Sequence, residues 1–180
     1  MIIARSDQGR LPVRPERIDP ADLLTRVRNR FVARAAIHGR RIVVGLAGPV
    51  IDADPLRLEQ ALGNLVENAI VHGEGTITLG GRERDGGLEL FVDDDGRGLP
   101  PEFAPRAFER FSRVDPARGR GGAGLGLSIV RAIARAHGGE ARIENRTDRA
   151  RKHASILVPR SSVTTGSGVD GPPAGAERAR

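Results

Sequence analysis

Two asparagines, Asn64 and Asn68, form the first pattern that could do chemistry. They lie four residues apart in a segment whose apolar residues recur at helical spacing, so both amides project from one face of a helix, one turn apart. Amide oxygens suit Mg²⁺, which keeps several waters and takes its remaining ligands from substrate phosphates. Glu67, beside Asn68, could position a water or a hydroxyl. The alternative is that all three residues belong to a solvated helix face.

A second pattern is the acidic and glycine-rich segment that begins at Asp94 and continues through Gly96 and Gly98. It follows an apolar run that is typical of a strand. A carboxylate at such a strand end can accept a hydrogen bond from the exocyclic amine of adenine, and glycines let the backbone approach a flat base. Alternatively, the three successive aspartates at positions 93–95 are an acidic turn that ends the strand.

A longer glycine-rich stretch, residues 119–126, leads directly into a predicted helix. Backbone N–H groups and the positive end of the helix dipole face outward at such a start, which makes it a suitable cradle for phosphate. The stretch is neither a P-loop, because no Gly-Lys-Ser/Thr follows, nor a dinucleotide-binding fingerprint. Arg113, Arg118 and Arg120 could pair with phosphate oxygens. A glycine-rich loop of this length also suits a mobile lid.

These patterns, taken in order with the F-E-R-F segment at 108–111, resemble the ATP-binding catalytic domain of sensor histidine kinases. That domain belongs to the superfamily shared with DNA gyrase, Hsp90 and MutL. The matching segments are the N box at 64–68, the first glycine box at 94–98, the F box and the second glycine box at 122–127. The lead-in and the first helix match as well, so the resemblance covers residues 19–159.

The resemblance implies a site for ATP and Mg²⁺. Asn68 together with Asn64 would coordinate Mg²⁺, Asp94 would read the adenine amine, and Phe108 and Phe111 would anchor the lid. Our candidate catalytic residues are Asn64, Glu67 and Asn68. The other residues expected at the nucleotide are His72, Gly96, Gly98, Arg113, Arg118, Arg120, Gly122, Gly124, Leu125, Gly126 and Leu127. Asn64 stands where the ATP-hydrolysing relatives carry a catalytic glutamate, which favours the kinase branch.

The chain also departs from the family pattern. Val71 stands where many relatives carry a phosphate-binding lysine or arginine, a contact that Arg120 could supply instead. Ala123 replaces a common threonine or glutamine of the lid. The last predicted hairpin carries residues 146–153 in place of a short glycine turn. We therefore expect ATP binding, while the rate of turnover stays open.

None of the four histidines stands where a complete kinase of this kind carries its phosphoacceptor. That histidine lies on a helical hairpin before the catalytic domain and is followed by an acidic residue. Here a glycine or an alanine follows each of His38, His72, His137 and His153. The chain is expected to be either a fragment of a longer kinase or a catalytic half that phosphorylates a separate dimerisation and phosphoacceptor protein. In both cases a response regulator would act downstream.

Two other classes stay open. An anti-sigma-factor-type serine kinase shares the fold and also works without an attached acceptor, although its N box and lid usually differ from this pattern. The other class is a nucleotide-binding adaptor module without turnover, which Val71 and Ala123 favour.

Composition restricts the partners. The net charge of +6 is spread along the chain as arginines, which favours solvated side chains and an anionic ligand such as a nucleotide over nucleic acid. The apolar runs are far shorter than a membrane span, no signal peptide is visible, and the chain has no cysteine. We expect a cytoplasmic protein without direct membrane insertion.

Capping and periodicity predict the elements that position these residues. Helices are expected from Asp19-Pro20 to Gly39, from Asp54-Pro55 to His72-Gly73, and over about 125–136. Strands are expected over residues 41–46, 76–79, 88–92, 141–144 and 155–158.

Helices segregated from a mixed sheet predict an α+β fold, a two-layer α/β sandwich with the helices on one face. The resemblance implies the Bergerat type of ATP-binding fold. We expect a lead-in over residues 1–18, the catalytic domain over 19–159, and a disordered tail over 160–180, where apolar periodicity is lost.

Overall fold

The main sheet has five strands in the order β2-β4-β5-β7-β6. The computed structural model describes residues 11–96, 98–100, 102–112, 124–146 and 151–160. The strands are β2 (Arg41–Val44), β4 (Thr76–Arg84), β5 (Gly87–Asp94), β6 (Glu140–Arg146) and β7 (Arg151–Pro159). The β2 strand pairs with β4 in parallel, and the other neighbours are antiparallel, so the sheet is mixed as predicted.

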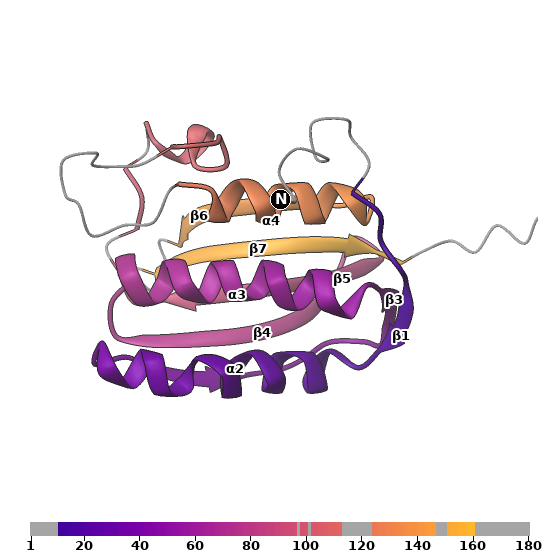
Figure 1. Ribbon diagram of the computed structural model, residues 1–180, viewed down its shortest axis with the longest axis horizontal. Helices are drawn as coiled ribbons and strands as arrows, with labels where there is room; N and C mark the ends of the chain where they lie inside the picture. The colour runs from indigo at the N-terminus through magenta and orange to yellow at the C-terminus, as the bar shows by residue number, and fades with distance from the viewer. Residues whose placement is uncertain (1–10, 97, 101, 113–123, 147–150, 161–180) are drawn as a thin grey trace, which may run out of the picture.

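Three helices cover one face of this sheet (Figure 1). They are α2 (Pro20–Ile37), α3 (Pro55–His72) and α4 (Gly126–Ala136), which confirms the predicted two-layer α+β sandwich. The core between the layers is aliphatic. Its largest fully buried side chains are Leu23, Leu24, Leu58, Leu62, Leu65, Ile70, Ile77, Leu79, Leu88, Leu90, Ile133 and Ile156.

The first two helices begin with the predicted capping signal. Asp19 accepts a hydrogen bond from the N–H of Ala21 at 2.8 Å, and Asp54 accepts one from the N–H of Arg57 at 3.0 Å. A proline follows each cap at the first helical position, where its missing N–H costs nothing. Both helices therefore start where the sequence predicts.

Ion pairs join α2 to α3 along their length. Arg26 contacts Glu59 at 2.5 Å, and Arg34 contacts Glu67 at 2.5 Å. Because residues eight apart on one helix pair with residues eight apart on the other, the two helices run in the same direction, as Figure 1 shows. Because these ion pairs are partly exposed, they contribute little to the free energy of folding, and their main effect is to align the two helices.

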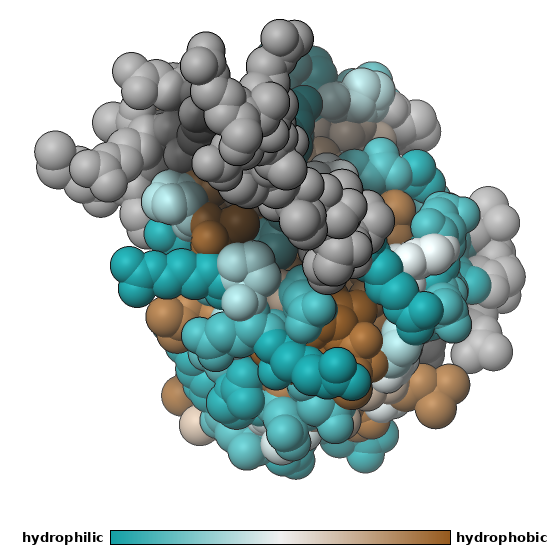
Figure 2. Space-filling view, turned by 90° about the vertical axis from the view of Figure 1, so that its right-hand side faces the viewer, coloured by the Kyte–Doolittle hydropathy of each residue, from teal (hydrophilic) through white to brown (hydrophobic). Residues whose placement is uncertain are grey.

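A second, smaller sheet was not predicted. It pairs β1 (Glu16–Ile18) with β3 (Ile51–Ala53) in antiparallel fashion. The N–H of Arg14 also donates to Asp54 Oδ2 at 2.9 Å, so the lead-in is fixed to the cap of α3. Figure 2 views this end of the molecule and shows a mostly hydrophilic surface with small, separate hydrophobic patches. A short 3-10 helix, η1 (Ala104–Arg106), was not predicted either.

The two long strands β4 and β5 extend further than predicted. They meet at a turn whose Asp85 and Gly86 have φ of 50° and 72°, the backbone that a tight hairpin turn requires. Gly80 faces Phe91 across the two strands, and a Cβ at Gly80 would overlap the Phe91 ring. The glycine therefore makes room for the ring.

The sheet face opposite the helices carries a buried polar cluster, formed by Glu89, Asp93, His153 and Ser155. Glu89 accepts hydrogen bonds from Arg82 at 2.6 Å and from Arg84 at 2.7 Å. His153 Nδ1 lies 2.5 Å from Asp93 Oδ1. In the part of the chain that the structure describes, no helix is long and apolar enough to cross a membrane.

Candidate nucleotide-binding site

The N-box helix α3 presents the two asparagines as predicted. Asn64 and Asn68 are half-buried, whereas the neighbouring apolar residues Leu65, Val66 and Ala69 are at most 1% exposed. A Cβ added at Gly126, the first residue of α4, would lie 3.7 Å from Asn64 Oδ1. The structure therefore brings an N-box amide against the start of the helix that follows the second glycine box.

The start of α4 has the features of an anion cradle. Leu125 precedes the helix without a side-chain hydrogen bond to its first turn, and Ser128 Oγ donates to the Leu125 carbonyl at 2.8 Å rather than to an N–H. The N–H groups of the first turn are thus not capped by these side chains. Together with the helix dipole they favour a negatively charged ligand.

Asp94 is buried at the end of β5, with 1% of its surface exposed. Its Oδ1 accepts a hydrogen bond from the Gly96 N–H at 3.0 Å. Lys152 Nζ lies 2.9 Å from Oδ2, which nevertheless has no partner with hydrogen-bond geometry among the described residues. The ion pair compensates the charge of Asp94, and the hydrogen-bonding capacity that Oδ2 keeps fits a donor supplied by a ligand.

Two glycines enclose this carboxylate. A Cβ at Gly73, the C-cap of α3, or at Gly96 would come within 2.6 Å of Asp94 Oδ1. Any larger residue at either position would displace the carboxylate. The C-terminal end of α3 and the first glycine box therefore fix the position of Asp94. The same helix carries Asn64 and Asn68 more than one turn before this end.

The neighbouring aspartates have other roles. Asp95 accepts a hydrogen bond from the Thr76 N–H at 2.9 Å and donates its own N–H to the Glu74 carbonyl at 3.0 Å. Asp93 pairs with His153 on the opposite face of the sheet. The interpretation as an acidic turn describes Asp95, whereas Asp94 has a separate, buried environment.

Gly98 lies against a residue that the sequence analysis missed. Its φ is 80°, and the space beside it is filled by the side chain of Asn145. Asn145 accepts from the Leu99 N–H at 2.8 Å and donates to the Leu99 carbonyl at 2.7 Å. The loop after the first glycine box is thus tied to β6. Asn145 directly follows the strand predicted over residues 141–144, and a single asparagine at that position gives no signal for this contact.

The two phenylalanines of the F box differ. Phe108 is 8% exposed and packs in the core, whereas Phe111 is 71% exposed. Phe111 contributes through its backbone: its N–H donates to the Gly124 carbonyl at 3.1 Å, and both residues have positive φ. The expected ring anchor is therefore Phe108 alone. The backbone of Phe111 joins the two ends of the expected lid.

Several predicted site residues lie outside the described residues, namely Arg113, Arg118, Arg120 and Gly122. The same holds for Ala123. Leu127 packs partly buried against the core.

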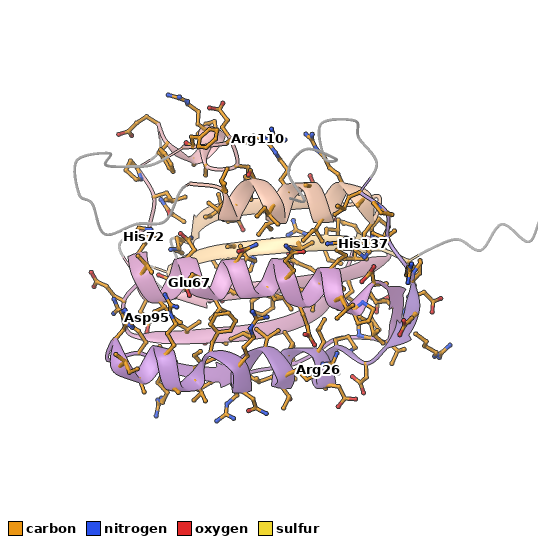
Figure 3. All side chains as sticks on the ribbon, viewed as in Figure 1. Arg26, Glu67, His72, Asp95, Arg110 and His137 are labelled. Atoms are coloured by element: carbon orange, nitrogen blue, oxygen red, sulfur yellow. The ribbon has the colours of Figure 1, made fainter. Side chains whose placement is uncertain are left out.

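Glu67, a candidate catalytic residue, is paired with Arg34 of α2, and Figure 3 shows it on the half of α3 that ends at His72. His72 is exposed at the end of α3. Arg40, which the sequence analysis also missed, donates to the Gly73 carbonyl and supports the end of this helix.

The residues at the site could hold Mg²⁺ only together with the phosphate oxygens of a bound triphosphate. Among the described residues, no group of three or more His, Cys, Asp or Glu side chains could hold a metal ion. On α3 the amide oxygens of Asn64 and Asn68 are hard ligands one helical turn apart. Such a pair suits an ion that completes its shell with waters and phosphate oxygens.

Comparison with known proteins agrees with this geometry. Residues 53–162 match the family model described as histidine kinase-, DNA gyrase B-, and HSP90-like ATPase. The chain is 40% identical over 126 residues to sensor histidine kinase component HK1 of Mycobacterium tuberculosis, covering 69% of this chain and 75% of that protein. It is 37% identical over 149 residues to sensor protein IrlS of Burkholderia pseudomallei, covering 81% of this chain and 32% of that protein.

A solved structure, full-length ShkA in complex with AMPPNP, superposes with a TM-score of 0.77 at 29% identity. The match covers 87% of this chain and 33% of that one. The chain thus spans about a third of IrlS and ShkA, and three quarters of HK1. On the family model, which covers more than half of the sequence, the chain belongs to the family of histidine kinase-, DNA gyrase B- and HSP90-like ATPases.

Proposed function

We propose that this chain is the ATP-binding catalytic domain of a two-component sensor histidine kinase. It transfers the γ-phosphate of ATP to a histidine on a dimerisation and phosphoacceptor domain that lies outside residues 19–159, and a response regulator acts downstream. The observation that carries the proposal is that α3 contacts both parts of the candidate site, the buried carboxylate of Asp94 and the N-terminus of α4. Gly73 at the end of α3 encloses the buried Asp94, and Asn64 lies against the start of α4.

Each of these two parts of the site suits one part of ATP. Asp94, whose Oδ2 is buried without a hydrogen-bond partner among the described residues, would accept the adenine amine. The N–H groups at the start of α4 would bind phosphate. Asn68 with Asn64 would hold Mg²⁺, which would supply positive charge to the triphosphate.

The phosphoryl group needs little covalent help from the protein, because positioning and electrostatic stabilisation dominate its transfer. Asn64, Asn68 and the α4 N-terminus would orient the triphosphate, while the acceptor imidazole would come from the other domain. Glu67 is held by Arg34 and would need to exchange that partner to act on a proton. We therefore assign Glu67 a weaker role than the two asparagines.

Transfer chemistry tests this proposal against the two alternatives. The purified chain is mixed with γ-labelled ATP, Mg²⁺ and a protein carrying an acceptor helical hairpin. Acid-labile label on a histidine of that protein supports the proposal. Acid-stable phosphoserine would instead indicate an anti-sigma-type serine kinase, and intact ATP binding without transfer would indicate an adaptor. The names of the relatives, sensor histidine kinases and sensor proteins, favour the first outcome.

A further inference from the structure

Lys152 is placed where a ligand base would meet Asp94. The two residues face each other in the register of β5 and β7, with Nζ 2.9 Å from Oδ2. Their side chains are only 4% and 1% exposed, and Lys152 is the only lysine of the chain. Lysine is almost never buried without a compensating charge. The pair is therefore a buried ion pair between β5 and β7 rather than a surface contact.

We propose that Lys152 is a second base-reading residue, which donates a hydrogen bond to ring nitrogen N1 of adenine. The inference rests on the proposed ATP site, in which Asp94 accepts the amine next to that nitrogen. Although Nζ lies close to Oδ2, that oxygen has no hydrogen-bond partner among the described residues. An ammonium has three N–H donors, so its ion pair with Oδ2 leaves donors that can face a base.

The chemistry of the pair matches the order of groups on adenine. A carboxylate only accepts hydrogen bonds, and an ammonium only donates them. Adenine presents an amine donor and, beside it, the N1 acceptor, so Asp94 and Lys152 would each meet the complementary group. In the same orientation guanine presents a carbonyl acceptor to Asp94 and an N1–H donor to Lys152. Both contacts would then be repulsive, which gives a physical reason for rejecting guanine.

The test compares ATP with 1-deaza-ATP, in which a carbon replaces N1 while the amine is kept. Affinities of both nucleotides are measured by calorimetric titration of the full chain and of Lys152→Met. We expect the wild-type chain to bind 1-deaza-ATP roughly ten- to a hundredfold more weakly than ATP, as for a hydrogen bond from a charged donor. In Lys152→Met the two affinities should become equal, with ATP weakened toward the analogue. GTP should bind the wild-type chain much more weakly than ATP.

Asn68→Ala is the matched control, because it acts at the phosphate end. It should weaken both nucleotides by the same factor and leave their ratio unchanged. If Lys152→Met does not fold with Asp94 uncompensated, the double variant Asp94→Asn/Lys152→Met removes both charges and should give the same equality. Equal binding of ATP and 1-deaza-ATP by the wild-type chain would overturn the role of Lys152, as would an unchanged ratio in the variant. Failure of the wild-type chain to bind any nucleotide would instead overturn the proposed function itself.

Discussion

Asp54 donates its backbone N–H to Nε2 of His137 at a distance of 3.0 Å. Nδ1 of the same ring lies 2.9 Å from the Ile133 carbonyl, which can only accept. Nδ1 therefore carries the proton and Nε2 accepts, so one neutral tautomer of His137 is fixed. The contact joins the start of α3 to the end of α4, the two helices that carry the amides and the phosphate cradle of the proposed site.

This contact gives a stability prediction. His137→Phe keeps an aromatic ring but leaves the Asp54 N–H without its acceptor, so the free energy of unfolding should fall by about 1–3 kcal/mol. Chemical denaturation measures it. His38→Phe is the matched control, because His38 caps α2 in the same position but is exposed. The free energy of unfolding of His38→Phe should differ from that of the wild-type chain by no more than about 0.5 kcal/mol. Equal losses in the two variants would show that the His137 contact stabilises nothing.

The pH dependence of the free energy of unfolding should reflect the ionisation of Glu89. Burial would raise the pKa of Glu89, but hydrogen bonds from Arg82, Ser155 and Arg84 outweigh it and lower the pKa below its ordinary value of 4.5. A lowered pKa means that ionised Glu89 stabilises the fold fully above pH 4.5, and that this contribution is lost as the pH falls through the folded-state pKa. Glu89→Gln should therefore be less stable than the wild-type chain at neutral pH.

The difference between the two proteins should shrink on acidification. Denaturation curves at a series of pH values down to about 3 measure it, and using the difference cancels the other carboxylates. Asp54, whose pKa is also lowered because the N–H bonds from Arg14 and Arg57 outweigh burial, should act in the same direction in both proteins. A difference that stays constant with pH would contradict the assignment to Glu89.

The adenine contact can be tested at Asp94. Asp94→Asn keeps the shape but replaces an acceptor oxygen by a donor, so ATP affinity should fall roughly ten- to a hundredfold. Calorimetric titration gives the affinity, and thermal unfolding shows whether the variant folds with Lys152 unpaired. Unchanged ATP affinity in a folded variant would falsify the contact. Asp95→Asn is a useful comparison, because Asp95 bonds the Thr76 N–H and should alter stability rather than ATP affinity.

The metal contact can be tested at Asn68. Asn68→Ala should impair Mg²⁺-dependent binding of ATP far more than metal-free binding of ADP, because the amide would act through the ion. Titrations with and without Mg²⁺ make the comparison. If both affinities fall by the same factor, Asn68 supports the helix rather than the ion.

The helices could be predicted closely from the sequence, because their signals are local. Asp19-Pro20 and Asp54-Pro55 each place a capping carboxylate before a proline, and both helices begin there. Strands β4 to β7 were predicted too short for the opposite reason, whereas β2 ends at Val44, two residues before its predicted end. Residues 80–84 of β4 are glycines and charged residues, which form a strand only because Gly80 receives Phe91 and Arg82 pairs with Glu89. Strands β1 and β3 have three residues each, too few for any periodicity.

The site was predictable in its short motifs but not in its cross-strand contacts. Asn64, Asn68, Asp94 and the glycines stand in recognisable local patterns. Lys152 is 58 positions from Asp94, and their contact depends on the register of β5 against β7, which a single sequence does not contain. The same applies to Asn145, which holds the loop at Leu99. Polar residues at 152 and 153 also obscured the start of β7, since they are buried only opposite their acidic partners.

Transfer of phosphate to a histidine outside residues 19–159 is tested most directly by the distribution of label between the chain and an added acceptor. None of the four histidines is followed in sequence by an acidic residue, and His137 and His153 are bonded inside the fold. The chain alone with γ-labelled ATP and Mg²⁺ should remain unlabelled. An added acceptor hairpin should gain acid-labile phosphohistidine, which Asn68→Ala should abolish. Stoichiometric acid-labile label on the chain itself, removed by substituting one of its four histidines, would show that the acceptor histidine lies within this chain and not on another domain.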